Sequence, residues 1–291
     1  MPVQCTATGK EQVLAKLKVD KRKFFIKELT MKLGVCADPS AAPVLAAAGF
    51  EFLELHVQNH LKTTVEDEAA FPPELARIRA STLPCVAANC FLPADLKVTG
   101  PDVNRNALGS YAEIVFERAV LAGMDTIVFG SGGARRIPDG FERDIAWQQL
   151  VEFGQLIGPL AGRYGIVVVV EPLNQRECNV LTGVEEAGRY VEDVNHPNVR
   201  LLVDAYHWLK DDNDYEAIVA YGPLLSHVHI ATVANRRAPG VEDCDFTDFF
   251  RALKASGYDG RISIEAGWTD MAAEAPLAFE TLHRLVREAG W

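Results

Sequence analysis

The sequence predicts a closed (β/α)8 barrel, an α/β TIM-barrel fold in which eight parallel strands are each followed by a helix. Three observations predict it. The chain has 291 residues, which suits one such barrel. After Met31, short apolar runs alternate with helical patterns eight times. The run Ile166 to Val170 contains no polar residue, as expected for a strand that is buried on both faces of a parallel sheet.

Each predicted unit pairs one strand with the helix that follows it. In chain order, the strands and their helices are 32–37 with 43–48, 50–57 with 72–80, 84–91 with 105–122, 125–130 with 142–163, 166–171 with 182–194, 200–204 with 213–220, 226–231 with 246–255, and 261–265 with 272–289. An open doubly wound sheet is the alternative. It would require a glycine-rich phosphate turn after the first strand, and residues 36–39 (Cys-Ala-Asp-Pro) form none.

Composition excludes several classes of protein. The formal charge of −11 argues against a nucleic-acid partner, because an acidic surface repels phosphates. No apolar run approaches the ~20 residues of a membrane span, so we expect no membrane partner. The first residues lack the apolar core of a secretory signal, which indicates a cytoplasmic protein. The six cysteines are scattered without a CxxC pair, so reduced thiols are expected.

Residues 1–30 differ from the rest of the chain. They contain seven Lys or Arg against three Asp or Glu, with rough helical periodicity from Glu11 to Leu29. An amphipathic arm for a partner or a membrane surface is one interpretation. We favour a weakly ordered basic extension, since polar termini commonly pack poorly. The predicted division is therefore an extension at 1–30 and a single catalytic barrel domain at 31–291.

Polar residues stand at the ends of the last four predicted strands. Glu171 follows Val170 directly, Asp204 follows Val203, and Glu265 follows Ile264. The seventh strand carries His227 and His229, which share one face because side chains alternate along a strand. The carboxyl ends of barrel strands meet at one face, where barrel active sites lie. We therefore expect one imidazole and three carboxylates to converge there.

Such a set predicts a divalent metal site. Three neighbouring carboxylates ionise at high cost without a cation. Oxygen donors with one imidazole suit Mn²⁺, Mg²⁺ or Co²⁺ better than zinc. A chelated hydroxy-ketone becomes acidic at the carbon α to its carbonyl, and a nearby carboxylate can remove that proton. Taken singly, each residue has a structural interpretation: Asp204 as a helix cap, His229 as a core histidine, Glu171 as a strand-end carboxylate.

The motifs at these strand ends resemble the xylose-isomerase-like barrel superfamily, in particular its sugar isomerase and epimerase branch with the ketose 3-epimerases. The residues that carry the resemblance are Glu171 to Glu177 (Glu-Pro-Leu-Asn-Gln-Arg-Glu), Asp204 to His207 (Asp-Ala-Tyr-His), His227 to Ala231 (His-Val-His-Ile-Ala), and Ile264 with Glu265. The resemblance covers about residues 31–290.

The resemblance implies a role for each matching residue. Glu171, Asp204, His229 and Glu265 would hold one divalent metal, commonly Mn²⁺. Glu171 and Glu265 would also be the two acid/base groups, on opposite faces of a cis-enediolate. Glu177 and His207 would bind the carbonyl end of the sugar, and Arg236 its hydroxyls, with Arg237 as a rival by position. The resemblance also implies a homo-oligomer, commonly a dimer or tetramer.

Two long connections follow strand ends, at 92–110 and 130–141, and are interpreted as lids. The second contains Arg135 and Arg136 in a glycine-rich segment. This segment could hold a phosphate or carboxylate, but a solvated or salt-bridged arginine pair is favoured. Asn89, Cys90 and Trp268 are expected to shape the pocket. For Trp268, stacking on a sugar face and plugging the barrel mouth are both open.

Four functions compete for this site. We favour a metal-dependent isomerase or epimerase acting on a ketose or related hydroxy-ketone. The alternative is a lyase resembling the keto-inositol dehydratases, in which the same enolate loses a β-hydroxyl. A nucleic-acid hydrolase like the endonucleases of the superfamily would need further histidines and an Asp-x-His pair, which the sequence lacks. A non-catalytic barrel is disfavoured by the complete carboxylate set.

Overall fold

Eight parallel strands close into a barrel in the computed structural model, which describes residues 31–61, 63 and 65–291. The strands are neighbours in chain order, and pairing of β1 with β8 closes the barrel. They are β1 (Lys32–Cys36), β2 (Phe52–His56), β3 (Cys85–Asn89), β4 (Thr126–Phe129), β5 (Val167–Val170), β6 (Val199–Asp204), β7 (Leu225–Ile230) and β8 (Arg261–Ile264). The predicted fold is confirmed, and the open doubly wound alternative is wrong.

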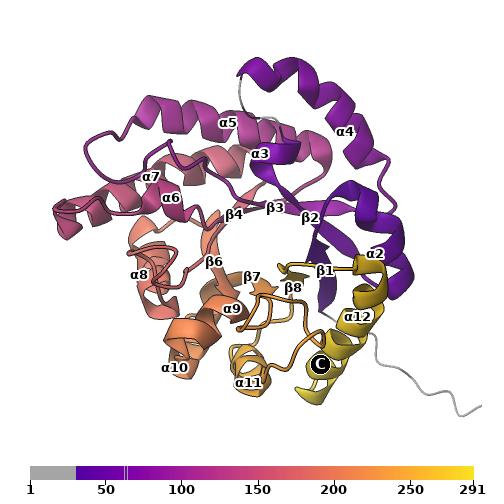
Figure 1. Ribbon diagram of the computed structural model, residues 1–291. Coiled ribbons are helices and arrows are strands. Elements are labelled where there is room, and N and C mark those ends of the chain that lie inside the picture. The colour runs from indigo at the N-terminus through magenta and orange to yellow at the C-terminus, as the bar shows by residue number, and fades with distance from the viewer. Residues whose placement is uncertain (1–30, 62, 64) are drawn as a thin grey trace, which may run out of the picture.

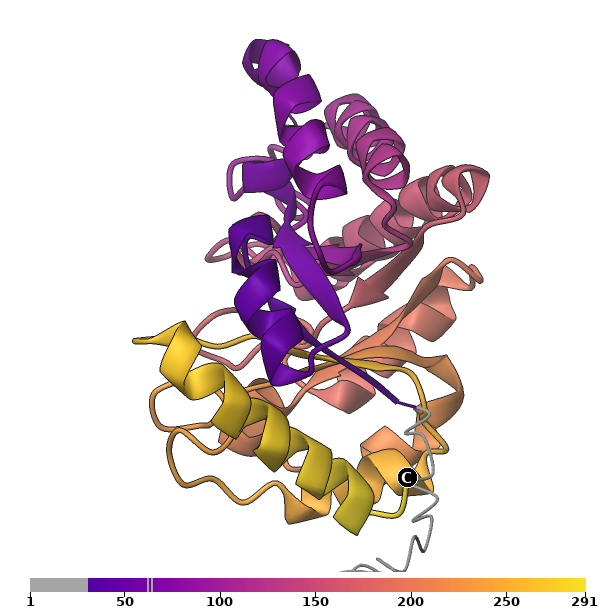
Figure 2. The ribbon, with the colours of Figure 1, turned by 90° about the vertical axis from the view of Figure 1, so that its right-hand side faces the viewer.

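Helices surround the strands on the outside of the barrel (Figure 1), and α12 runs along its outer side in the turned view (Figure 2). They are α2 (Ala42–Ala48), α3 (Val57–His60), α4 (Phe71–Arg79), α5 (Arg105–Ala122), α6 (Gly132–Arg135), α7 (Arg143–Tyr164), α8 (Val184–Val194), α9 (Ala205–His207), α10 (Tyr215–Ala220), α11 (Thr247–Ala255) and α12 (Met271–Glu288). Shorter turns are η1 (Pro39–Ala41), η2 (Val65–Ala70), η3 (Trp208–Asp212) and η4 (Gly222–Leu224).

The predicted elements match those observed to within two residues at each end. Sequence analysis missed α3, α6 and α9, which contain four residues or fewer. A helix this short completes about one turn and therefore shows no amphipathic period. Each of the three begins at or near the end of a strand, so the omission concerns the face on which the candidate site lies.

Two apolar layers fix the direction of the strand side chains. On β5, Val168 and Val170 pack outward in the large cluster between strands and helices, whereas Val169 packs with Val128 and Leu202 from the neighbouring strands. Because side chains alternate along a strand, Glu171 takes the inward direction of Val169. The valine run therefore aims the carboxylate of Glu171 into the barrel mouth.

Two observations concern membrane spans and the start of the chain. Among residues 31–61, 63 and 65–291, no helix combines the length and the hydropathy needed to cross a bilayer. The predicted basic extension at 1–30 lies outside the described residues, so the division of the chain at residue 31 stays a prediction.

Candidate metal centre and active site

The structure brings the four predicted ligands together at the C-terminal end of the barrel. Glu171 follows β5, Asp204 is the last residue of β6, His229 lies in β7 and Glu265 follows β8. One donor atom from each of the four lies within 4.8 Å of the others. Glu171, Asp204 and His229 are buried, and the Glu265 side chain is 20% exposed. His227, on the same strand face, is not part of this group.

Histidine and arginine nitrogens hold the carboxylates in place. Nδ1 of His229 lies 3.2 Å from Oε1 of Glu171 and 3.6 Å from Oε2 of Glu265. Arg236 contacts the same Oε2 of Glu265, and its Nη2 lies 3.7 Å from Oδ2 of Asp204. Asn89 donates a hydrogen bond of 2.8 Å to the other oxygen, Oε1 of Glu265. One oxygen of each carboxylate therefore faces the common centre.

Two buried atoms at this centre have no hydrogen-bond partner among the described residues. They are Oδ2 of Asp204 and Nε2 of His207. A buried carboxylate oxygen without a partner is costly, and a bound cation removes that cost. Three carboxylates with one imidazole are also the donor set that Mn²⁺ and Mg²⁺ accept. The residues present therefore fit a divalent ion held by Glu171, Asp204, His229 and Glu265.

The surroundings of the two glutamates move their pKa values in opposite directions. Burial and the nearby Glu265 raise the pKa of Glu171. Burial also opposes ionisation of Glu265, but His229 and Arg236 outweigh it and lower its pKa to about 2. Burial, reinforced by Glu171, raises the pKa of Asp204 to about 7. Two carboxyl groups whose pKa values move apart can serve as an acid and a base at one pH.

His207, a predicted substrate-binding residue, is buried and held by Asn174. The backbone N–H of Asn174 donates to Nδ1 of His207 at 3.1 Å, and the Asn174 side-chain nitrogen lies 2.9 Å from the same atom. Burial and the charge of Arg236 lower the pKa of His207 to about 3, so the ring is neutral. A neutral ring that accepts at Nδ1 carries its proton on Nε2. Nε2–H is therefore available to donate to a ligand oxygen.

In the loop between β7 and α11, the two candidate substrate-binding arginines, Arg236 and Arg237, contact different partners. Gly267 donates its backbone N–H to the carbonyl of Arg236 at 2.8 Å, which ties the loop to the chain after β8. The guanidinium of Arg236 lies 4.5 Å from the centre of the Tyr206 ring, and its Nη1 lies 3.7 Å from Oε1 of Glu177. Arg237 instead pairs with Glu274 at 2.6 Å. Arg236 and Glu177 thus lie beside the carboxylates, and Arg237 does not.

A cavity of about 360 Å³ opens over this centre. Asn89 and Cys90 line it, as predicted, together with Glu177, His207 and Arg236. Trp268 is not among its lining residues, and the indole packs against the apolar core. This placement contradicts stacking of Trp268 on a bound sugar in this cavity.

Three residues of the cavity wall have left-handed backbone. Cys90, Ser131 and Arg236 line the cavity, and their φ angles are 54°, 35° and 50°. Left-handed backbone is costly for residues with a side chain, by roughly 1–3 kcal/mol each, and persists where surrounding contacts fix it. The three positions therefore indicate a wall whose shape is held against local preference.

Arg135 corrects the expectation for the glycine-rich segment. The favoured interpretation, a solvated or salt-bridged pair, is wrong for Arg135, which is fully buried. Its guanidinium donates to the backbone carbonyls of Phe129 at 3.0 Å and of Glu171 at 2.7 Å. Arg135 therefore joins the ends of β4 and β5 and is not free to hold an anion. Exposed Arg136 contacts the carbonyl of Arg176.

Gly130 leaves room for the carboxylate of Glu171. A Cβ atom at residue 130 would overlap Oε2 of Glu171. Gly130→Ala is therefore expected to displace this carboxylate and to lower turnover by on the order of 10²-fold, as small misplacements of reacting groups do. Gly109→Ala in α5 is the matched control, because its Cβ would meet only Leu156 at 3.8 Å. Steady-state rates of both variants check this, and equal rates would contradict it.

Sequence analysis missed two polar contacts behind the site. Glu54 of β2 is buried inside the barrel and hydrogen-bonds both His227 and His229. Asn89 was expected to shape the pocket, but its bond to Glu265 was not foreseen. The signal for Glu54 was its inward parity with Phe52 and His56 in the strand Phe-Leu-Glu-Leu-His.

Fold and site together define a class: a (β/α)8 barrel with a carboxylate-rich donor set at the ends of its last four strands. The family model described as xylose isomerase-like TIM barrel matches residues 43–288. The chain therefore belongs to the xylose isomerase-like TIM barrel family, and the resemblance inferred from its motifs is confirmed.

Curated relatives of this chain include several epimerases and putative hydroxypyruvate isomerases. A D-psicose 3-epimerase of Ruminiclostridium cellulolyticum is 26% identical over 176 residues, which cover 59% of each chain. A ketose 3-epimerase of Arthrobacter globiformis is 35% identical over 114 residues, 38% of this chain and 39% of the relative. A 3-dehydro-D-guloside 4-epimerase of Escherichia coli is 33% identical over 112 residues, 38% of this chain and 42% of the relative. The matches thus span 39 to 59% of these relatives.

Solved structures share the fold over most of the chain. A D-psicose 3-epimerase crystallised in the presence of D-fructose has a TM-score of 0.74 at 21% identity, covering 90% of this chain and 100% of that one. A D-allulose 3-epimerase from Methylomonas sp. in complex with D-allulose has a TM-score of 0.75 at 22% identity, covering 87% and 96%. At this identity the similarity shows the fold alone.

Proposed function

We propose that the protein is a divalent-metal-dependent sugar isomerase or epimerase that acts on a ketose or a related hydroxy-ketone. The observation that carries the proposal is the group formed by Glu171, Asp204, His229 and Glu265, with donor atoms within 4.8 Å of one another beneath a cavity. The names of the relatives, which include epimerases of ketoses and of a keto-glycoside, support this reaction class. They favour return of the proton over loss of water, so the dehydratase alternative is not carried further.

The two glutamates have the arrangement that proton transfer needs. Glu171 and Glu265 both lie near Nδ1 of His229, at 3.2 and 3.6 Å, and their pKa values are moved in opposite directions. In the proposed reaction ionised Glu265 removes the proton from the carbon α to the carbonyl, and the C–H electron pair forms the enediolate. Protonated Glu171 then returns a proton to the opposite face, which inverts that carbon. When bound, the metal ion supplies positive charge that stabilises the enediolate oxygens.

Three further side chains would hold the sugar for this step. The Nε2–H of His207 makes no hydrogen bond, although it lies 3.5 Å from Oδ2 of Asp204, and in this proposal it donates to the carbonyl oxygen. Arg236 and Glu177 lie beside the carboxylates and could bind hydroxyls, and Arg236 also provides positive charge for the developing enediolate. The ion is proposed to be Mn²⁺, with Mg²⁺ or Co²⁺ as alternatives. A cytoplasmic location and homo-oligomers stay predictions.

The test is proton NMR in D₂O of Mg²⁺-loaded protein with ketoses, ketose phosphates, keto-glycosides and keto-inositols. Deuterium appearing α to a carbonyl, with an isomer accumulating, supports the proposal and identifies the substrate. Loss of water to an enone or diketone would support a lyase instead. No exchange with any of these compounds, in protein shown to hold metal, would eliminate the sugar proposal.

Arg236 and Arg237 provide a variant and a matched control that test whether Arg236 binds the substrate. Arg236→Ala is expected to raise KM by about 10- to 100-fold, the value of one or two lost charge-assisted hydrogen bonds. Affinity for Mn²⁺ should not weaken, because a cation beside the ligands is removed. Arg237→Ala breaks only the pair with Glu274 and should leave KM unchanged. A larger effect of Arg237→Ala on KM would reverse the assignment.

A further inference from the structure

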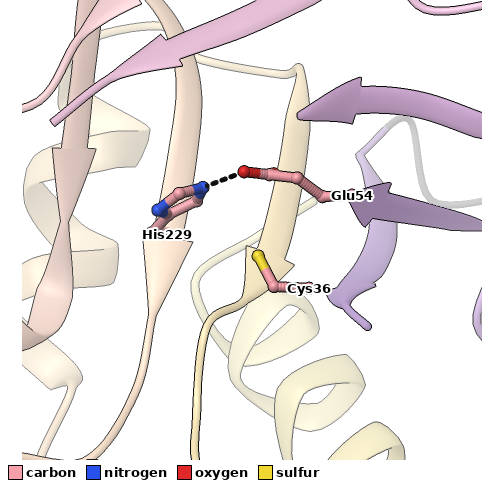
Figure 3. A group of neighbouring side chains, drawn as sticks. All are labelled: Cys36, Glu54 and His229. Carbon is pink, nitrogen blue, oxygen red and sulfur yellow. Dashed lines mark hydrogen bonds and ion pairs between the residues drawn. The ribbon is translucent and has the colours of Figure 1, made fainter. Parts of the chain in front are cut away.

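A second group of donor atoms lies behind the metal centre. It consists of Cys36 at the end of β1, Glu54 in β2 and His229 in β7, whose donor atoms lie within 4.8 Å of one another (Figure 3). Glu54 and His229 have no exposed side-chain surface. The two groups share His229, which presents Nδ1 to the first and Nε2 to the second. One imidazole therefore connects the two groups.

Hydrogen bonds already occupy both oxygens of Glu54. Oε1 lies 2.9 Å from Nε2 of His229. Oε2 lies 2.8 Å from Nε2 of His227 and accepts a hydrogen bond from the hydroxyl of Ser263 at 2.7 Å. Asp204 in the first group differs, because its Oδ2 makes no hydrogen bond among the described residues, with Nε2 of His207 at 3.5 Å and Nη2 of Arg236 at 3.7 Å. The carboxylate of Glu54 is therefore satisfied by hydrogen bonds within the protein, whereas that of Asp204 has one oxygen without a hydrogen bond.

We propose that Glu54 is a positioning residue that fixes His229 as a metal ligand. An ionised carboxylate is an acceptor only, so the proton shared with His229 belongs to Nε2. With Nε2 protonated, the lone pair that can bind a metal is on Nδ1, which faces Glu171 and Glu265. A carboxylate behind a ligating histidine fixes the tautomer and ring orientation and strengthens the imidazole as a donor. The inference rests on the metal site of the proposed function.

The same contacts explain why the ligand is His229 and not His227. Both rings give Nε2 to Glu54, and both side chains point inward from β7. His229 lies two residues nearer the C-terminal end of β7 than His227 does. Its Nδ1 lies 3.2 Å from Oε1 of Glu171. The Nδ1 of His227 is buried and has no hydrogen-bond partner among the described residues. His227 therefore helps to hold the carboxylate of Glu54 in place through its Nε2.

The test measures metal binding without any sugar. Glu54→Gln keeps the shape of the side chain but removes its charge, and one amide position becomes a donor. We expect the dissociation constant for Mn²⁺, measured by electron paramagnetic resonance, to rise about 10- to 100-fold. Ser263→Ala and Cys36→Ser are the controls. The first removes one hydrogen bond to the same carboxylate, and the second removes the thiol, so both should bind Mn²⁺ within a few-fold of the unmodified protein.

The tautomer of His229 gives a second readout that needs no variant to fold. In ¹⁵N-histidine-labelled, Mg²⁺-loaded protein, long-range ¹H–¹⁵N spectra should show His229 protonated at Nε2. Protonation at Nδ1, or Mn²⁺ affinity unaffected by Glu54→Gln, would overturn the proposal. Loss of a bound Mn²⁺ equivalent in Cys36→Ser would overturn it in favour of a second metal site. Because no substrate is used, failure of the sugar proposal would leave these results standing.

Discussion

Glu265→Gln is expected to suppress hydrogen exchange from the epimer whose proton lies on the face of Glu265, with a rate loss of roughly 10²–10⁴-fold from the missing acid/base group alone. The lost metal ligand adds to this effect. The amide retains an oxygen that can accept the hydrogen bond from Asn89, so the fold should remain intact. Deuterium uptake from D₂O measures the loss of exchange, and circular dichroism measures whether the fold is intact.

The two epimers of a substrate separate the roles of the glutamates. A proton on the face of Glu265 depends on that residue, whereas a proton on the opposite face depends on Glu171. With Glu265→Gln, exchange from the first epimer should vanish and exchange from the second should persist at a reduced rate. Glu171→Gln should show the reverse. Equal loss for both epimers, in variants that still hold metal, would mean that Glu265 acts only as a ligand.

A third glutamate gives the matched control. Glu274, at the start of α12, pairs with Arg237 and does not line the cavity. Glu274→Gln makes the same chemical change away from the proposed reacting groups. It should leave exchange from both epimers unchanged.

The sequence predicts the barrel and four of its site residues for one physical reason. Strands buried on both faces are continuous apolar runs, so a carboxylate directly after such a run marks the end of the strand. Glu171 and Asp204 follow this rule, Glu265 follows the shorter pattern Ile-Ser-Ile, and His229 was found from its inward parity in β7; the structure brings the four together. Parallel strands in a barrel place their C-terminal ends at one face. Residues that are far apart along the chain could therefore be predicted to lie together.

The sequence did not predict the roles of residues that depend on tertiary contacts. Glu54 lies inside a strand, where a polar residue ordinarily indicates a solvated face. Its partners, His227, His229 and Ser263, are more than 170 residues away along the chain. Arg135 beside Arg136 suggested a charged surface, but backbone carbonyls of Phe129 and Glu171 hold it inside. Neither arrangement leaves a periodic pattern in the sequence.

The choice between Arg236 and Arg237 depended on backbone conformation. Arg236 adopts a left-handed φ of 50°, and a hydrogen bond from Gly267 ties its carbonyl to the loop after β8. This turn sends adjacent side chains to different neighbours, Arg236 to Glu265 and Arg237 to Glu274. A non-glycine residue in this conformation is uncommon, and spacing alone does not reveal it.

Asp204→Asn is expected to stabilise the metal-free protein and to destabilise the metal-loaded protein relative to the unmodified chain. Burial and Glu171 raise the pKa of Asp204 from 3.8 to about 7. The folded state thus binds this proton more tightly than the unfolded state, and stability from this group is lost as pH rises through about 7. Above that pH, removing the charge should increase the unfolding free energy by about 1–3 kcal/mol.

Asparagine preserves the local structure in this variant. Oδ1 of Asp204 accepts a hydrogen bond from the backbone N–H of Tyr206 at 2.9 Å, and asparagine caps a helix as well as aspartate does. The gain in stability should therefore be visible at pH 8 and shrink toward pH 5, where the unmodified Asp204 is protonated. Asp214→Asn replaces another capping aspartate, at the start of α10, and is the matched control for exchanging a capping carboxylate for an amide.

Metal should reverse the order of stability. At an Mn²⁺ concentration of about 100 times Kd, binding stabilises the unmodified protein by about 2.7 kcal/mol, which raises the melting temperature by several degrees. Asp204→Asn lacks one anionic ligand and should gain far less. Thermal melts at pH 8 with chelator and with Mn²⁺ should therefore cross: the variant melts higher without metal and lower with it. If the unmodified protein melted higher in both conditions, charge repulsion at Asp204 would not be what the metal relieves.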